Sequence, residues 1–517
     1  AGLTVTGTYD LQGGIDVITA TDGANIAGVN GGVDTTAETL VLATNGAGAG
    51  LGSRVTMTVA QHEAFTTVTA AGTADQVTFS AAGAGTAINA EVEIDQYVLA
   101  GVAAEVNTIN VNAGNLDVNI TGAASADTVN VAGLTVTGTY DLQGGIDVIT
   151  ATDGANIAGV NGGGATTAET LSLTGGITMT LAQHEAMSIS AGGGNETGAN
   201  VDTVTLTTAG TFTGQGDVET YVLANATGNV FTQVDGNVSV KGGTSNDRII
   251  TSAVDAVRSS LTVDLSAGGR DTVEIRNGEV TSVPSLIDNW TSWDGFSQVP
   301  ANETDAEGGA VLNGFIASTR NDPDIIDPNA TGATQDRNFT GTYGQSVSDW
   351  NGTDGTYAVT ITGFTAGDVD GADVIESFWG AVDLSNAIFV ENAVLNQTDL
   401  TGVASGSVIE LDATQTFQLV NYANLAAVAA LLSNSGDGDA LLGLNDGFYT
   451  VIFYRGTGGA SAADPADAYI YQITVDEGDG LDFVSNEWAG NYDADSIELV
   501  GILVDIGANT LAGQNFA

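Results

Sequence analysis

The chain has 517 residues, a length that predicts three or four domains of ordinary size. It carries 63 acidic residues against 9 lysines and arginines, so its formal net charge is -54, and such a surface repels nucleic acid and anionic membranes while it attracts cations. The absence of cysteine excludes disulfides, thiolate zinc sites and a cysteine nucleophile, and the 43% hydrophobic content argues against disorder.

The N-terminal half contains a long internal repeat. Residues 1–32 recur without change as residues 132–163, and the match then continues more loosely. A third copy begins near Leu261 and breaks off after Ile275. We therefore predict a first β repeat at 1–131, a second β repeat at 132–258 and a partial third repeat at 259–283.

Within these repeats, short segments alternate Thr or Asn with apolar residues, and clusters of Gly, Asn and Asp separate them. Period-two alternation predicts β-strands, and the clusters predict turns. Two all-β architectures fit: a parallel β-solenoid-like repeat region, which we favour, and a series of tandem β-sandwich domains. The predicted strands include 3–6, 16–19, 40–42, 55–59, 76–79, 109–112 and 116–120.

The C-terminal half is built differently. All five prolines and all five tryptophans follow residue 283. We predict a Trp- and Pro-containing intermediate region at 284–360 and a β-rich C-terminal domain at 361–517, with one short helix at 422–432. No apolar run approaches the roughly 20 residues that a membrane-spanning helix needs. Trp290 and Trp293 could stack on sugar rings, which would suit an adhesin.

A glycine-containing turn, an aspartate and an apolar strand recur together along the repeats. Glycine allows the backbone to turn with positive φ, and the aspartate places a carboxylate at the strand entrance. Stacked corners of this kind could surround Ca²⁺, which takes six to eight oxygen ligands. The alternatives are aspartates that only form turns and carboxylates that only solvate the surface. The candidate ligands in the repeats are Asp16, Asp127, Asp147, Asp202, Asp247 and Asp271.

These features resemble those of the repeats-in-toxin proteins, which are exported by type I secretion. The nearest local match is 242–249 (GGTSNDRI), and the resemblance also covers 361–385, 468–474, the acidic loop 476–482 and the chain end from 497. The resemblance implies bound Ca²⁺ and a C-terminal export domain, and it adds Asp368, Asp370 and Asp373 as candidate ligands. The chain departs from that family because it has no run of tandem nonapeptides.

Residues suited to catalysis are few. The two histidines, His62 and His184, occupy the same place in successive repeats, which favours a structural role, and the chain has no His-Glu-x-x-His, Gly-x-Ser-x-Gly or phosphate-loop motif. We predict that the chain is not an enzyme but a secreted, extracellular structural protein that self-assembles on a bacterial cell surface. Its partners would be Ca²⁺ and copies of itself. The alternatives are a calcium-dependent adhesin that binds a cell-surface glycan and a fragment of a secreted hydrolase.

Overall fold

The computed structural model divides into two compact units, Ala1–Asn225 and Ala226–Ala517. Residues 284–358 lie outside the described part, so only residues 359–360 of the predicted intermediate region are described. Of the predicted helix at 422–432, Val428 and Leu432 are described, and both are helical and buried. The structure describes residues 3–8, 17–30, 38–43, 52–70, 72–82, 85–101, 106–145, 147–160, 169–191, 201–224, 227–234, 237–251, 261–276, 359–367, 371–378, 388–394, 397–412, 428, 432, 444, 447–456, 465–475, 496–507 and 510–516.

The first unit is a stack of parallel strands with two short helices in its described part. Its sheets run in the orders β1-β3-β5-β7-β9-β11-β13, β2-β4-β6, β8-β10-β12-β14-β16-β18 and β15-β17-β19-β21. The elements are β1 (Thr4–Thr8), β2 (Val17–Ala20), β3 (Ala24–Asn30), β4 (Glu38–Leu42), β5 (Arg54–Met57), α1 (Val59–Ala64), β6 (Phe65–Ala70), β7 (Gln76–Phe79), β8 (Ile88–Asn89), β9 (Gln96–Val98), β10 (Val106–Asn110), β11 (Asn119–Thr121), β12 (Ala126–Ala132), β13 (Tyr140–Asp141), β14 (Val148–Thr152), β15 (Ala155–Asn156), β16 (Glu169–Thr174), β17 (Gly176–Met179), α2 (Leu181–Ala186), β18 (Met187–Ala191), β19 (Thr203–Leu206), β20 (Thr211–Thr213) and β21 (Thr220–Val222).

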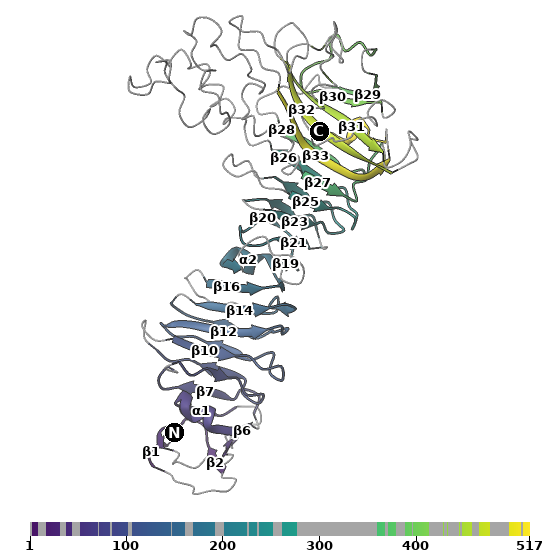
Figure 1. The fold of residues 1–517 in the computed structure, drawn as a ribbon. Helices are drawn as coiled ribbons and strands as arrows, with labels where there is room; N and C mark the ends of the chain where they lie inside the picture. Colours follow the sequence, from purple (N-terminus) through teal and green to yellow (C-terminus); the bar gives the residue numbers. More distant parts are fainter. Residues whose placement is uncertain are drawn as a thin grey trace, which may run out of the picture. The chain divides into compact units, whose positions relative to one another are not determined.

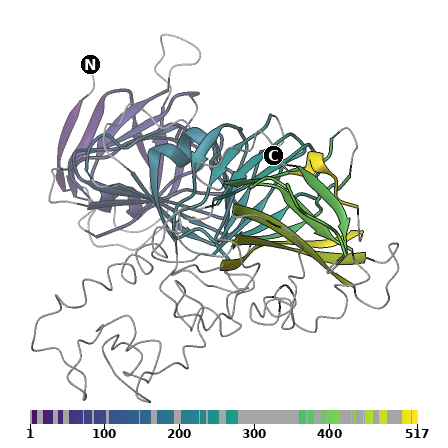
Figure 2. The same cartoon turned by 90° about the horizontal axis from the view of Figure 1, so that it is seen from above.

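Each sheet joins strands that are one rung apart, because odd-numbered and even-numbered strands pair separately. Figure 1 shows β10, β12, β14 and β16 as successive rungs, and in Figure 2 the purple and blue strands overlie one another. Alternation explains the packing: Val129 and Val131 of β12 are buried, whereas Thr128 and Asn130 between them are half-exposed. The apolar half of each strand therefore fills the interior of the stack.

The second unit begins with parallel strands and ends in an antiparallel group. Its sheets run in the orders β22-β24-β26-β28 and β23-β25-β27-β33-β32-β31-β30-β29, and the pairs β31–β32 and β32–β33 are antiparallel. Tyr449, Phe453 and Tyr471 are buried in the core of that group. The elements are β22 (Val230–Thr232), β23 (Val238–Lys241), β24 (Arg248–Ile250), β25 (Leu261–Asp264), β26 (Thr272–Arg276), β27 (Val359–Thr362), β28 (Val374–Phe378), β29 (Phe389–Ala393), β30 (Val408–Leu411), β31 (Gly447–Gly456), β32 (Pro465–Val475), β33 (Ser496–Gly507) and a 3₁₀ turn at Gly513–Asn515.

These sheets confirm the predicted all-β, solenoid-like fold. The sandwich alternative required antiparallel sheets in the repeats, whereas the described pairings from β1 to β21 are parallel. Within the described residues, no helix is long and apolar enough to cross a membrane.

The long sequence repeat corresponds to a group of rungs. Helix α1 lies between β5 and β6, and α2 lies between β17 and β18, so corresponding elements of the two copies are twelve strands apart. By the same count β12 corresponds to β24, and β14 corresponds to β26. The domain-sized period is therefore a set of stacked rungs and not the length of one sandwich.

Candidate functional site

Buried polar side chains form a ladder at the entrances of the even-numbered strands. Asn107, Asp127 and Asp147 stand at neighbouring positions on β10, β12 and just before β14, and each is at most 1% exposed. The side-chain amide of Asn107 donates to Oδ1 of Asp127 over 2.7 Å, and the backbone N–H of Asp127 donates to Oδ1 of Asp147 over 2.8 Å. Successive rungs are thus joined by carboxylates as well as by the strand ladder.

The ladder recurs twelve strands further along the chain. The side-chain amide of Asn229 donates to Oδ1 of Asp247 over 2.7 Å, and the backbone N–H of Asp247 donates to Oδ1 of Asp271 over 2.8 Å. One rung further, the N–H of Asp271 donates to Oδ1 of Asp373, also over 2.8 Å. These aspartates are no more than 2% exposed.

A related ladder occupies the odd-numbered strands, and sequence reasoning found only part of it. The N–H of Ser53 donates to Oδ1 of Asp75 over 2.6 Å, and the N–H of Gly175 donates to Oδ1 of Asp202 over 2.7 Å. Asp75 is 1% exposed and was not among the candidates. The sequence pattern that could have identified Asp75 is Ala-Asp-x-Val, which also surrounds Asp127. No glycine immediately precedes Asp75.

The ladder corners fall into two kinds, and in the first kind both carboxylate oxygens are bonded. Oδ2 of Asp127 accepts the N–H of Ala123 over 2.8 Å, and Oδ2 of Asp247 accepts the N–H of Gly243 over 2.7 Å. In both cases the donor lies four residues before the aspartate. Both oxygens of Asp75 and Asp373 are bonded too, because Oδ2 accepts the N–H of Gly72 and of Thr365 respectively. We call Asp127 and Asp247, which correspond to each other, the closed corners. Backbone N–H groups stabilise a carboxylate and compensate for its removal from water.

In the second kind, one carboxylate oxygen has no partner. Oδ2 of Asp147 and Oδ2 of Asp271 are buried and accept no hydrogen bond. Both aspartates follow a Gly-Gly-x sequence, and we call these two the open corners. Burial is the main cause that raises the pKa of the Asp147 carboxyl, and it raises the pKa of Asp271 to about 7. A charged oxygen left alone in the interior is therefore the main electrostatic liability of the ladder.

Glycine shapes the open corners. Gly145 and Gly269 have φ of 141° and 129°, and each lies two residues before an open-corner aspartate. A Cβ on Gly145 would be 2.2 Å from the carbonyl oxygen of Ser125, and one on Gly269 would be 2.6 Å from that of Ser245 and 3.0 Å from Oδ1 of Asp271. At both positions, only a residue without a side chain fits against the serine carbonyl of the preceding rung.

The predicted calcium ligands are distributed unevenly over these corners. Asp16, Asp368 and Asp370 lie outside the described residues, and the other six candidates lie at strand entrances. Across the part of the chain that the structure describes, no three His, Cys, Asp or Glu side chains come together in a way that could hold a metal ion. A cation would instead need one carboxylate oxygen together with backbone carbonyls, a donor set that suits Ca²⁺. The buried, unpartnered Oδ2 atoms of Asp147 and Asp271 are carboxylate oxygens of the kind that such a site needs.

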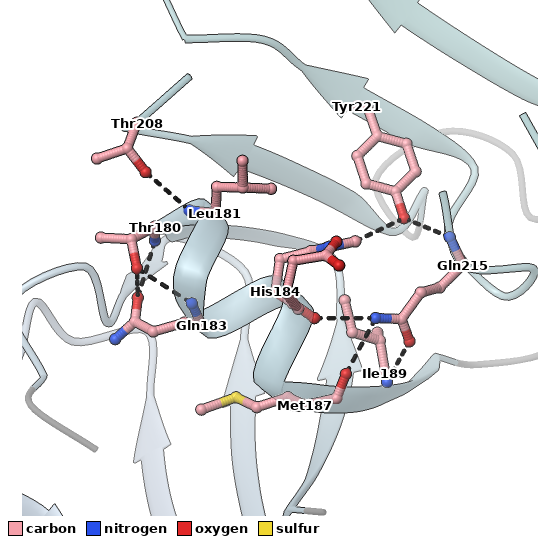
Figure 3. Close-up of polar contacts among 10 residues, drawn as sticks. Thr180, Leu181, Gln183, His184, Met187, Ile189, Thr208, Gln215 and Tyr221 are labelled. Atoms are coloured by element: carbon pink, nitrogen blue, oxygen red, sulfur yellow. Dashed lines mark hydrogen bonds and ion pairs between the residues drawn. The ribbon is translucent and has the colours of Figure 1, made fainter. Parts of the chain in front are cut away.

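The two histidines lie in the short helices: His62 in α1 and His184 in α2. We call these two places the histidine corners. Thr180 caps α2: its hydroxyl accepts the N–H of Gln183 over 3.2 Å, and the Gln183 side chain accepts the N–H of Thr180 over 2.8 Å. Figure 3 shows that His184 then meets Tyr221, with 3.2 Å between Nε2 and Oη, while Nδ1 lies 3.1 Å from Glu185. His62, Tyr97 and Glu63 repeat this arrangement in the first copy.

The surroundings of His184 hold it neutral. Burial lowers its pKa, and burial also raises the pKa of Tyr221, so the phenol keeps its proton. Because Oη of Tyr221 accepts the N–H of Gln215 over 2.8 Å, its hydrogen is available to Nε2 of the histidine. The network therefore assigns the histidine proton to Nδ1, facing Glu185.

Gln215 binds the same helix from the next rung. Its side chain donates to the carbonyls of His184 and Met187 over 3.2 and 3.0 Å and accepts the N–H of Ile189 over 2.7 Å (Figure 3). Such a network anchors the helix to the stack and holds the imidazole in a fixed orientation.

The chain matches no protein-family model, no curated protein and no solved structure. We therefore infer its function from the carboxylate ladder and the charge of the chain.

Proposed function

We propose that this chain is a calcium-stabilised structural protein of the bacterial cell surface, exported in the manner of the repeats-in-toxin proteins and assembling with copies of itself. The observation that carries the proposal is the recurrence of the same carboxylate ladder after twelve strands. Each ladder bond joins one rung to the next, as between Asp127 and Asp147 or between Asp247 and Asp271. Repeating these inter-rung bonds lengthens and stiffens the stack, and a scaffold requires such a stack.

The charge supports a need for cations. A formal charge of -54 opposes any compact state and any approach of two copies, because like charges repel. Calcium would relieve both effects, since it neutralises carboxylates within the stack and can be shared between carboxylates of two chains. Folding would then follow secretion into a calcium-rich medium, because an ion that binds only the folded chain adds its binding free energy to folding.

The contacts of the histidines suit the same function. Each imidazole is buried between a tyrosine and a glutamate and holds a helix against the stack. The tryptophans on which an adhesin would depend, Trp290 and Trp293, lie outside the described residues.

Light scattering tests the proposal. Purified full-length chain is brought to millimolar CaCl2 and then treated with excess chelator while particle size is followed. The proposal predicts large particles that form with calcium and dissolve with chelator. Particle size that is unchanged by calcium, together with binding to cell-wall glycans, would replace the scaffold with an adhesin.

A further inference from the structure

The open and closed corners differ in one respect that bears on where calcium can bind. Each closed-corner aspartate directs both of its oxygens at N–H donors: Asp247 accepts from the N–H and side-chain amide of Asn229 through Oδ1 and from the N–H of Gly243 through Oδ2. The positive ends of these N–H dipoles lie where a cation would have to approach. A closed corner is therefore electrostatically complete without an ion.

Each open-corner aspartate is incomplete. Its Oδ1 accepts the N–H of the preceding rung's aspartate, and its Oδ2 is buried with no donor. The same defect occurs at Asp147 and Asp271, which stand at corresponding positions in different copies and have different neighbours, Ile146 and Arg270. Its recurrence indicates a built feature, because a buried carboxylate oxygen without a partner is costly.

We infer that calcium binds the stack at the open corners, through Oδ2 of Asp147 and Oδ2 of Asp271, and does not bind at the closed corners of Asp127 and Asp247. This inference rests on the proposed calcium dependence and narrows it to one of the two kinds of corner. The remaining ligands come from backbone carbonyls, for which the carbonyls of Ser125 and Ser245 are placed against Gly145 and Gly269. The signature of such a site in the sequence is Gly-Gly-x-Asp before an apolar strand, and Asp16 shares it.

The matched corners supply the test. Full-length chains carrying Asp147→Asn or Asp271→Asn are compared with Asp127→Asn and Asp247→Asn by calorimetric titration with CaCl2. Each open-corner substitution should remove one calcium per chain, because the amide cannot supply the anionic oxygen. Each closed-corner substitution should leave the calcium stoichiometry unchanged.

Thermal unfolding of the same four chains gives a second readout. In chelator, Asp271→Asn should unfold at or above the wild-type temperature because it removes an uncompensated buried charge; in calcium it should unfold below the wild type. Asp247→Asn should unfold below the wild type in both media, since its new amide faces the N–H of Gly243.

Three results would overturn the inference: unchanged calcium stoichiometry in both open-corner variants, loss of a calcium in a closed-corner variant, or open-corner variants that fail to fold even in chelator. The proposed function can fail separately. If Asp271→Asn loses one calcium but the wild type never forms particles, the calcium sites are supported and the scaffold function is not. If the wild type assembles reversibly but the open-corner variants keep all their calcium, the scaffold function is supported and the calcium sites at the open corners are not.

Discussion

The two twelve-strand copies keep the same carboxylate corners but differ at their histidine corners. In the first copy, Glu63 lies 2.8 Å from His62 and is also held by Asn89, whose N–H and side-chain amide donate over 2.9 and 2.6 Å. In the second copy, Glu185 lies 3.1 Å from His184 and its side chain is 53% exposed, against 21% for Glu63. The bonds that join rungs inside the stack recur, whereas those at its surface vary. We therefore expect the interior ladder to contribute more to stability than the contacts of the two glutamates.

The largest expected effect comes from removing a closed corner in either copy. Asp127→Ala and Asp247→Ala each leave several buried N–H donors without an acceptor, and we expect a loss of about 3–5 kcal/mol. Because the two corners are equivalent, the losses should agree closely in urea unfolding. A loss of stability below about 1 kcal/mol at either position would contradict a stabilising role for the closed corners.

The glycines of the open corners come next. Gly145→Ala and Gly269→Ala place a Cβ 2.2 and 2.6 Å from a serine carbonyl at positive φ, and we expect each to cost about 2–4 kcal/mol. Gly144→Ala is the matched control, because a Cβ there meets nothing within 4 Å. Thermal unfolding should separate the three, and an equal effect at Gly144 would contradict the proposed close approach.

A pH dependence should appear when calcium is chelated. Burial raises the pKa of Asp271 to about 7, so the folded chain binds a proton more tightly there than the unfolded chain does. Stability from this group is therefore fully present below the unfolded pKa of 3.8 and is lost as pH rises through about 7. We expect about 2–3 kcal/mol between pH 5 and pH 8, measured as the difference between wild type and Asp271→Asn. A difference that grows in the opposite direction would refute this account of the corner.

The smallest effect distinguishes the histidine corners. Glu63→Gln should cost about 1 kcal/mol because its bonds to Asn89 and His62 lose their charge, while Glu185→Gln should cost less than about 0.5 kcal/mol at its exposed position. Chemical unfolding of the two variants makes the comparison. Equal costs would show that the surface network of the first copy adds nothing.

Much of the fold could be predicted from local patterns, because alternation of Thr with Val fixes which face of a strand is buried. The position of Asp127 at a strand entrance also followed from its place before an alternating segment. Its partner could not be read in the same way: the hydrogen bond from Asp127 goes to Asp147, 20 residues away, and depends on how the rungs stack. The two kinds of corner depend on whether a backbone N–H four residues earlier reaches Oδ2, and that is set by the path of the turn and not by composition.

An anomalous difference map from crystals of the chain soaked in terbium chloride, as a probe for calcium, would show which corners bind the ion. Calcium binding at the open corners predicts a peak beside Oδ2 of Asp147 and another beside Oδ2 of Asp271, with none at Asp127 or Asp247. Peaks at the closed corners, or open corners that stay empty while terbium binds elsewhere on the chain, would contradict it.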